Sequence, residues 1–420
     1  MNELERKVCN RVKEMESELV EVLSGVVAIN TPDPPGDNYD ACAEFLSAYL
    51  KKLGANVRIE QVPAESLPRN PETGKPLSRP NVVAEIKGSG KGPVLHFNGH
   101  YDVVPAVGEW ASDPYKPEVR DGKLYGRGTT DMKAGIVASM VAAKALKLEK
   151  VNLEGTISFS FVPDEENDLE AGAKFLAEQK KVQADYCIVA EPTGAEDLCN
   201  GHKGCLWLEI ATHGKPAHGS SPWKGINAFA KMIAVAQEID NKIKPGLLHQ
   251  EDTEIDESIA RKTGVITVGG RVTTGESPNI VPPRCTMTID RRLAPGESVK
   301  EALADFTAIL ESLKKEDPKF SGDYKIISQY EPCIISPDSP FVRVVKETIE
   351  KVIGRIPEVS VMAGGCDMRY FHAAGVPTLV YGPGTIGMAH QQDEYVKVKD
   401  LVVAAQVYAL TAMELLKVRS

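Results

Sequence analysis

The stretch VLHFNGHYD, residues 94–102, places an imidazole and a carboxylate directly after a short apolar run that is typical of a buried strand. Two further runs of this kind, TISFSFV at 156–162 and YCIVA at 186–190, are also followed by acidic residues. Helical periodicity at 132–148 and 169–179 separates the three runs. Strands that alternate with helices of this length indicate a mostly parallel sheet covered on both faces. We therefore predict an α/β fold.

The same pattern extends toward both ends of the chain. Helices are predicted at 4–27, 39–53, 341–353 and 401–416, and strands at 57–62, 81–86 and 376–381. Because the C-terminal elements resume the alternation of strands and helices, we expect residues 1–200 and 333–420 to form one discontinuous α/β domain.

Residues 201–332 have a different order of predicted elements. Their predicted elements are a strand at 205–212, a helix at 226–239, strands at 264–272 and 284–291, a helix at 299–313 and a strand at 324–330. The order β-α-β-β-α-β is that of a ferredoxin-like α+β unit, which can fold around its own core. We therefore expect an inserted domain at 201–332.

Composition excludes several classes of protein. The 420 residues carry a formal net charge of −10, from 49 Lys and Arg against 59 Asp and Glu, with 42% hydrophobic residues. These ordinary globular values argue against disorder and against an electrostatic nucleic-acid binder. We find no apolar run that approaches the roughly 20 residues of a membrane helix, and the charged N-terminal residues lack the apolar core of a signal peptide. We expect a cytoplasmic protein without nucleic-acid or membrane partners.

Candidate chemistry lies where the predicted strands end, because ligands of open α/β sheets bind outside the carboxyl ends of the strands. The side chains found there and in the adjoining loops are His100, Asp102, Asp131, Glu165, Glu166, Glu191 and His390. Carboxylates held close together repel one another unless a cation lies among them. Imidazole and carboxylate donors without a thiolate suit Zn²⁺, Co²⁺ or Mn²⁺, and two such ions about 3.5 to 4 Å apart require a bridging carboxylate.

Each motif alone also has an ordinary structural interpretation. Asp131 alone fits a helix N-cap, and Glu165 with Glu166 fits a solvated turn before a helix. Glu191 alone fits an extended residue before a proline. It is the joint occurrence of the motifs, each after a predicted strand or before a predicted helix, that favours a metal site.

Together these segments resemble a known family. GHYD at 99–102, GRGTTDMKAG at 126–135, the pair Glu165–Glu166, EPT at 191–193 and His390 are similar to motifs of the co-catalytic metallohydrolase family of acetylornithine deacetylase, succinyl-diaminopimelate desuccinylase, aminoacylase and glutamate carboxypeptidase. The resemblance implies two divalent metal ions, with Zn²⁺ favoured over Co²⁺ or Mn²⁺. It implies His100 and Glu191 as ligands of one ion, Glu166 and His390 as ligands of the other, and Asp131 as the bridge. It further implies Glu165 as the general base and Asp102 as the carboxylate that orients His100.

The segment at 201–332 carries family-like motifs as well. GKPAHG at 214–219 and GIN at 225–227 resemble the motif of a lid domain. In the family, the histidine of this motif, here His218, polarises the scissile carbonyl and often reaches across a dimer. The resemblance therefore implies a homodimer formed through the lid domain.

Three further residues resemble positions that hold the substrate: Asn279, Arg292 and Arg369. Arg369 ends the stretch AGGCDMR at 363–369, in which the family often has Thr or Ser in place of Cys366. Asn167 and Asp168 likewise stand where members often have small residues. These departures concern substrate contacts and the surroundings of the glutamate pair.

The resemblance implies a metal-dependent amidohydrolase that deacylates N-acyl amino acids through attack by metal-activated water, of the acetylornithine deacetylase or succinyl-diaminopimelate desuccinylase type. The expected partner is a small N-acylated amino acid or dipeptide, and the expected setting is amino-acid biosynthesis. A dipeptidase or glutamate-type carboxypeptidase of the same fold is the alternative. A non-catalytic binding protein is a third, less favoured hypothesis.

Overall fold

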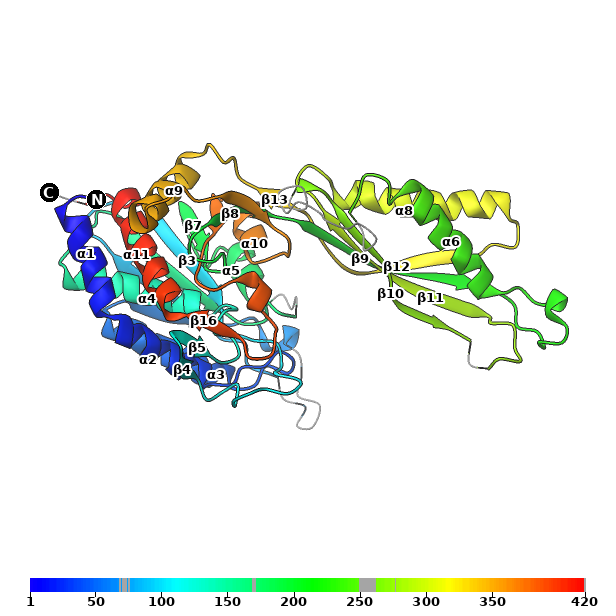
Figure 1. Cartoon of the computed structure of the whole chain (residues 1–420), viewed down its shortest axis with the longest axis horizontal. Coiled ribbons are helices and arrows are strands. Elements are labelled where there is room, and N and C mark those ends of the chain that lie inside the picture. Colours follow the sequence, from blue (N-terminus) through cyan, green and yellow to red (C-terminus); the bar gives the residue numbers. More distant parts are fainter. Residues whose placement is uncertain are drawn as a thin grey trace. The chain divides into compact units, whose positions relative to one another are not determined.

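The computed structural model describes residues 1–67, 69, 74, 76–167, 171–248, 262–275 and 277–418, and Figure 1 shows their elements. The chain divides into two compact units. The first comprises Met1–Asn200, Ile335–Ser360 and Cys366–Ser420, and the second comprises Gly201–Ile334 and Val361–Gly365. That these units act as a catalytic domain and a lid stays a prediction.

A nine-stranded sheet runs through the described part of the first unit and includes residues at its junction with the second. Its order is β1 (Asn56–Glu60), β2 (Asn81–Lys87), β6 (Thr156–Val162), β3 (Val94–His100), β7 (Tyr186–Val189), β15 (Thr378–Val380), β8 (Leu198–His202) and β13 (Cys333–Ile334), with β14 (Val359–Met362) also paired to β8. Strands β6, β3, β7 and β15 are parallel to one another, whereas β1, β2, β8 and β13 pair antiparallel. The α/β class is confirmed, and the sheet is mixed, with its parallel strands at the centre.

Helices cover this sheet. They are α1 (Glu3–Glu14), α2 (Glu16–Val27), α3 (Tyr39–Lys52), α4 (Lys133–Leu148), α5 (Ala173–Glu178), α9 (Pro340–Ile353), α10 (Met368–Ala373) and α11 (Val398–Leu415). Figure 1 shows α4 and α11 beside α1 and α2, and these helices pack against one another. Both α4 and α11 are buried along most of their length, which explains why apolar residues occupy almost every face of them.

Two predicted helices differ in their bounds. The expected helix at 4–27 is broken at Met15, which ends α1 and begins α2. Apolar residues continue across this break, so hydrophobic periodicity alone does not reveal it. The expected helix at 169–179 is observed as α5, which begins at Ala173. Residues 168–170, including Asp168, lie outside the described residues.

A second, small sheet in the first unit was not predicted. It has the order β16 (Tyr395–Lys397), β5 (Lys123–Tyr125) and β4 (Glu118–Arg120), all antiparallel. Three-residue strands are too short to show an alternating pattern. The pairing of β5 with β16 nevertheless matters, because it holds the loop before α4 beside the loop that carries His390.

The second unit has the predicted element order. It contains β9 (Gly204–His213), α6 (Ala228–Lys242), β10 (Val265–Thr274), β11 (Arg284–Leu293), α8 (Val299–Glu316) and β12 (Gly322–Tyr330). The described strands form an antiparallel sheet in the order β10-β11-β9-β12. Alternate residues of β9, Leu206 and Leu208, enter a core with Met232 of α6 and Phe306 of α8, so both helices cover one face of the sheet.

Short 3-10 helices complete the fold: η1 (Ala64–Ser66), η2 (Pro222–Lys224) and η3 (Ile386–Met388). Among the helices that the structure describes, we find none with both the length and the apolar character needed to cross a membrane.

Candidate metal centre

Three neighbouring parallel strands deliver the predicted metal ligands to one edge of the sheet. His100 is the last residue of β3, Glu165 and Glu166 follow β6, and Glu191 follows β7. Because β6, β3 and β7 are adjacent and parallel, their carboxyl ends meet at the same edge. Asp131 comes from the loop before α4, which the small sheet links to the loop that carries His390.

The imidazoles and carboxylates approach one another closely. His100 Nε2 lies 3.1 Å from Asp131 Oδ1 and 3.5 Å from Glu191 Oε1. His390 Nε2 lies 3.2 Å from Asp131 Oδ2 and 3.0 Å from Glu166 Oε2. The two oxygens of Asp131 therefore face two different imidazoles, which is the geometry that a bridging carboxylate needs.

The cluster contains two sets of potential ligand atoms, and within each set the atoms lie within 4.8 Å of one another. One set comes from His100, Asp131 and Glu166, and the other from His100, Glu165 and Glu191. The structure thus brings these predicted residues together around one point. Their division between two ions, and the choice of Glu165 as base, stay predictions.

Crowded carboxylates dominate the electrostatics of this cluster. Burial, together with Asp131, raises the pKa of Glu191 to about 8. Burial also raises the pKa of Glu165 well above its usual value, with Glu191 adding to the shift. Hydrogen bonds to Asp131 and Glu166 raise the pKa of His390 to about 10. Carboxylates crowded in this way are stabilised by a cation, and the donor types present fit divalent ions such as Zn²⁺, Co²⁺ or Mn²⁺.

Asp102 contacts His100 in a way that differs in detail from the expectation. The nearest partner of His100 Nδ1 is the backbone carbonyl of Asp102 at 3.0 Å, and the carboxylate Oδ1 lies at 3.5 Å. Because Nδ1 donates to a carbonyl oxygen, the lone pair of Nε2 is free to bind a metal ion. The Asp102 carboxylate has a second task, since Oδ2 accepts the backbone N–H of Glu166 at 3.1 Å.

Glu394 supports the centre. The sequence places it with His390 in the loop near this edge of the sheet, but no motif assigned it a role. Its buried carboxylate accepts backbone N–H groups from Gly128, Thr130 and Asp131 at 3.1, 2.8 and 3.1 Å. It also pairs with Arg127 at 2.6 Å. These bonds fix the loop that carries Asp131. The only sequence signal was weak, namely an acidic residue four positions after His390.

Asp367 is a further buried carboxylate whose role the sequence did not reveal. It belongs to the glycine-rich stretch at 363–369. Burial raises the pKa of Asp367 to about 6, although the charges of His100 and Arg369 lower it. Its Oδ2 has no hydrogen-bond partner within the described residues. A buried carboxylate that interacts with His100 and Glu165 extends the negative charge of the cluster.

The predicted substrate-binding residues are distributed over both units. His218, Asn279 and Arg292 belong to the second unit, whereas Arg369 belongs to the first. His218 is exposed, with Nδ1 2.8 Å from Ser220 Oγ, and it pairs by a β-bridge with Ile280, the neighbour of Asn279. The relation of these residues to the metal centre stays a prediction.

Both predicted substrate-binding arginines already have partners. Arg292 pairs with Asp290 at 2.8 Å, donates to Tyr330 Oη at 3.2 Å and lies over the Trp207 ring. Arg369 lies over the ring of Tyr370 and donates to its hydroxyl at 2.9 Å. A substrate carboxylate at Arg292 would therefore share the guanidinium with Asp290.

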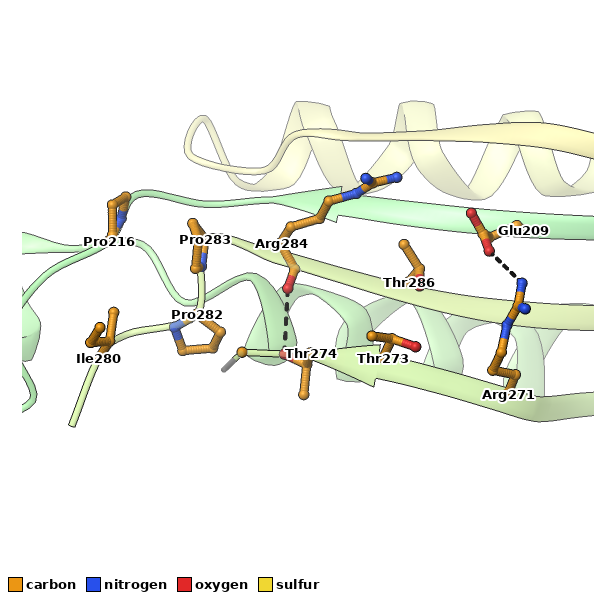
Figure 2. A pocket seen from close by; sticks show the side chains of 11 residues that line it. Glu209, Pro216, Arg271, Thr273, Thr274, Ile280, Pro282, Pro283, Arg284 and Thr286 are labelled. Carbon is orange, nitrogen blue, oxygen red and sulfur yellow. Dashed lines mark hydrogen bonds and ion pairs between the residues drawn. The ribbon is translucent and has the colours of Figure 1, made fainter. Parts of the chain in front are cut away.

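The second unit contains a pocket of about 750 Å³. Figure 2 shows its lining by β10, β11 and two prolines, Pro282 and Pro283, with an ion pair of 2.8 Å between Arg271 and Glu209 at one end. Pro216 and Ile280, which line the other end, stand beside the segments of His218 and Asn279.

Comparison with known proteins agrees with this geometry. Residues 96–414 match peptidase family M20/M25/M40, which is more than half of the chain. An uncharacterised metallohydrolase of Methanocaldococcus jannaschii is 28% identical over 93% of this chain and 98% of its own length. A probable succinyl-diaminopimelate desuccinylase of Staphylococcus aureus is 30% identical over 92% of this chain and 94% of its own length.

A solved structure shares the fold. The dinuclear metal-binding peptidase YxeP of Bacillus subtilis, from the M20 family, superposes with a TM-score of 0.68 at 17% identity and covers 97% of this chain and 100% of its own. Taken with the sequence matches, these findings show that the chain belongs to peptidase family M20/M25/M40 and is a metallohydrolase that acts on amide bonds.

Proposed function

We propose that this enzyme removes the acyl group from an N-acylated amino acid, in the manner of acetylornithine deacetylase or succinyl-diaminopimelate desuccinylase. The observation that carries the proposal is the cluster in which Asp131 faces both His100 and His390 with Glu165 close by. The relative at 30% identity, named a probable succinyl-diaminopimelate desuccinylase, supports the substrate class. A cytoplasmic location and a role in amino-acid biosynthesis are parts of the same proposal.

In this proposal His100 and Glu191 hold one divalent ion, and Glu166 and His390 hold the other, with Asp131 between them. Zn²⁺ is favoured, and Co²⁺ or Mn²⁺ also suits these donors. Such ions polarise an amide carbonyl and lower the pKa of water to about 7. The Bacillus subtilis protein is a dinuclear metal-binding peptidase of the same fold, which supports the number of ions.

Glu165 is proposed to move the proton. Its carboxylate accepts a proton from the water that attacks the carbonyl carbon, and it passes that proton to the nitrogen that leaves when the C–N bond breaks. Burial raises the pKa of Glu165, which suits a group that must both take up and release a proton near neutral pH. His218 is proposed to donate a hydrogen bond to the oxyanion.

A peptidase is the second candidate. The family is named for peptidases, and the Bacillus subtilis protein is one. A dipeptide and an N-acyl amino acid present the same reacting group, a linear amide beside a carboxylate, so the metal centre fits both. The non-catalytic alternative is not retained, because the family comparison supports a hydrolase.

We also propose a homodimer formed through the second unit. Trp223, Phe229 and Ile233 are exposed on η2 and α6, with 75%, 41% and 44% of their surface accessible. Exposed apolar side chains at this spacing are typical of interaction surfaces. Light scattering should give twice the chain mass, and Phe229→Asp with Ile233→Asp should give the mass of one chain.

A substrate panel tests the proposed activity. N-acetyl and N-succinyl amino acids and dipeptides are assayed with added Zn²⁺, Co²⁺ or Mn²⁺. We expect an N-acyl amino acid to give the highest kcat/KM. A dipeptide that is hydrolysed faster than every N-acyl compound would establish the peptidase instead, and hydrolysis of no substrate under any metal would contradict both.

A further inference from the structure

Arg79 is a buried cation in the first unit that pairs with Asp164, the residue before the glutamate pair. It lies just before β2 and is 1% exposed. Its guanidinium donates to Asp164 Oδ2 at 2.6 Å and to the carbonyls of Pro35 and Ser78 at 3.0 and 3.1 Å. A buried guanidinium with acceptors on several sides has little freedom to move, because any other position leaves charge or donors unpaired.

The partner of Arg79 directly precedes the proposed base. Asp164 has a φ of +65°, in the left-handed region that residues with a side chain adopt uncommonly. This residue lies between the end of β6 at Val162 and Glu165, where the backbone leaves the extended conformation of the strand. The ion pair with Arg79 therefore holds the residue at which the direction of the Glu165 segment is set.

Two further hydrogen bonds hold the residues that follow Glu165. The backbone N–H of Glu166 donates to Asp102 Oδ2 at 3.1 Å. The side chain of Asn167 donates to Asp33 Oδ1 at 2.8 Å. Asp33 belongs to the same loop as Pro35, so Arg79 and Asn167 both attach the glutamate segment to that loop.

The carboxylate of Glu165 lies near His100 and Glu191, in a cluster of charged groups. Its position depends on the backbone at residues 164 to 167. A shift of about 1 Å in a reacting group can cost about 100-fold in rate. Loss of a contact that fixes this short segment is therefore expected to lower kcat more than the accompanying loss of folding stability would suggest.

We propose that Arg79 is a positioning residue that sets where Glu165 and Glu166 lie, and that Asn167 provides a second attachment through Asp33. The inference rests on the proposed roles of Glu165 as base and Glu166 as metal ligand. It gives a reason for Asn167, which stands where the resembled family often has a small residue.

The test uses Arg79→Met, Arg79→Lys and Asn167→Gly in the full-length protein. We expect Arg79→Met to lower kcat by about 100-fold with KM nearly unchanged, because the substrate is held elsewhere. Arg79→Lys keeps the charge but not the fork of donors, so we expect an intermediate loss. Asn167 is exposed, and its replacement by Gly should fold normally and lower kcat several-fold.

Two readouts do not depend on activity. In the metal-free protein, hydrogen exchange at the amides of residues 164 to 167 should become faster in Arg79→Met and Asn167→Gly. In a Co²⁺ titration, one of the two equivalents should bind about 10-fold more weakly in Arg79→Met, while the other is nearly unchanged. Both readouts report the position of the segment even if no substrate is hydrolysed, so failure of the proposed function remains distinguishable.

Lys144→Met is the matched control. It removes an ion pair with Glu18 at 2.5 Å in the same unit, between α4 and α2. We expect a lower melting temperature with unchanged kcat, exchange at 164 to 167 and Co²⁺ binding. If Arg79→Met only lowers the melting temperature, as Lys144→Met does, Arg79 is merely structural and the proposal is wrong. If Arg79→Met fails to fold, unchanged exchange and kcat in Asn167→Gly overturn it.

Discussion

The two units hold their predicted functional residues in different ways. In the first, His100 and Asp131 are buried and lie 3.1 Å apart, within a cluster supported by Glu394. In the second, His218 is exposed and contacts Ser220, two residues away. The difference indicates that the cluster around Asp131 is fixed by contacts from distant parts of the chain, whereas the side chain of His218 is held by a near neighbour.

Two arginines show the same contrast. Arg79 and Arg292 each pair with an aspartate, but the side chain of Arg79 is 1% exposed and that of Arg292 is 25% exposed. Removal of Arg79 leaves Asp164 buried without its counter-ion, which is costly. Removal of Arg292 leaves Asp290 in contact with water. Replacement of Arg79 should therefore alter the reaction itself, and replacement of Arg292 should alter substrate affinity.

Metal removal should have the largest effect. A chelator should abolish hydrolysis, because the imidazoles and carboxylates of the first unit are proposed to act through the ions they hold. Zn²⁺, Co²⁺ or Mn²⁺ should restore activity, and saturating metal should raise the stability of the fold by about 3 to 4 kcal/mol at 100 to 1,000 times Kd. Calorimetry with and without metal measures the second effect, and full activity in the metal-free protein would contradict the assignment.

Replacement of the proposed base comes next. Glu165→Ala should lower kcat by about 1,000-fold while both ions remain bound, because Glu165 moves a proton and is not an assigned ligand. Steady-state kinetics and metal analysis on the same sample measure both quantities. Glu178→Ala, at the exposed end of α5, is the matched control and should be silent. Loss of metal in Glu165→Ala would make Glu165 a ligand instead.

The sequence predicted most of the fold because its long elements have clear periodicity. The order β9-α6-β10-β11-α8-β12 follows directly from alternating and helical patterns. The small sheet of β4, β5 and β16 could not be predicted, because strands of three residues have no measurable period. The break at Met15 was missed for the related reason that apolar residues run across it.

The candidate site shows a similar limit. His100, Glu165 and Glu191 could be located because each lies at the end of a recognisable strand. Glu394 could be placed in the loop of His390, but neither its role nor that of Arg79 could be inferred, because their contacts are with backbone and side chains far along the chain. Residues that carry chemistry therefore leave a motif, while those that position them depend on tertiary structure.

The metal-free centre should make stability depend on pH. The folded-state pKa values of His390 and Glu191 are raised to about 10 and about 8. A group whose pKa is raised by folding stabilises the fold below its unfolded pKa and loses that contribution as pH rises through the folded value. The contribution of Glu191 should be lost between about pH 4.5 and 8, and that of His390 between about pH 6.5 and 10, so the melting temperature of metal-free protein should fall from about pH 4.5 to 10.

The lowered pKa of Asp131 has the opposite sign, but its contribution is lost only in strong acid, outside that range. Bound metal should reduce or reverse the fall, since metal binding favours deprotonated ligands. His390→Asn should flatten the metal-free curve in particular above pH 8. A metal-free melting temperature that rises over this range would show that the cluster is not held together as the structure describes.

The smallest effect is expected in the second unit. Arg292→Ala should raise KM about tenfold, equivalent to about 1.4 kcal/mol for one charge-assisted hydrogen bond, with kcat changed little. The expected effect on KM is modest because the guanidinium of Arg292 already pairs with Asp290 and lies over the Trp207 ring. Arg284→Ala, an exposed arginine on the same strand β11, controls for loss of charge and should leave KM unchanged. A large loss of kcat in Arg292→Ala, with KM unchanged, would mean that this residue contacts the reacting atoms, and the contrast between Arg79 and Arg292 would not hold.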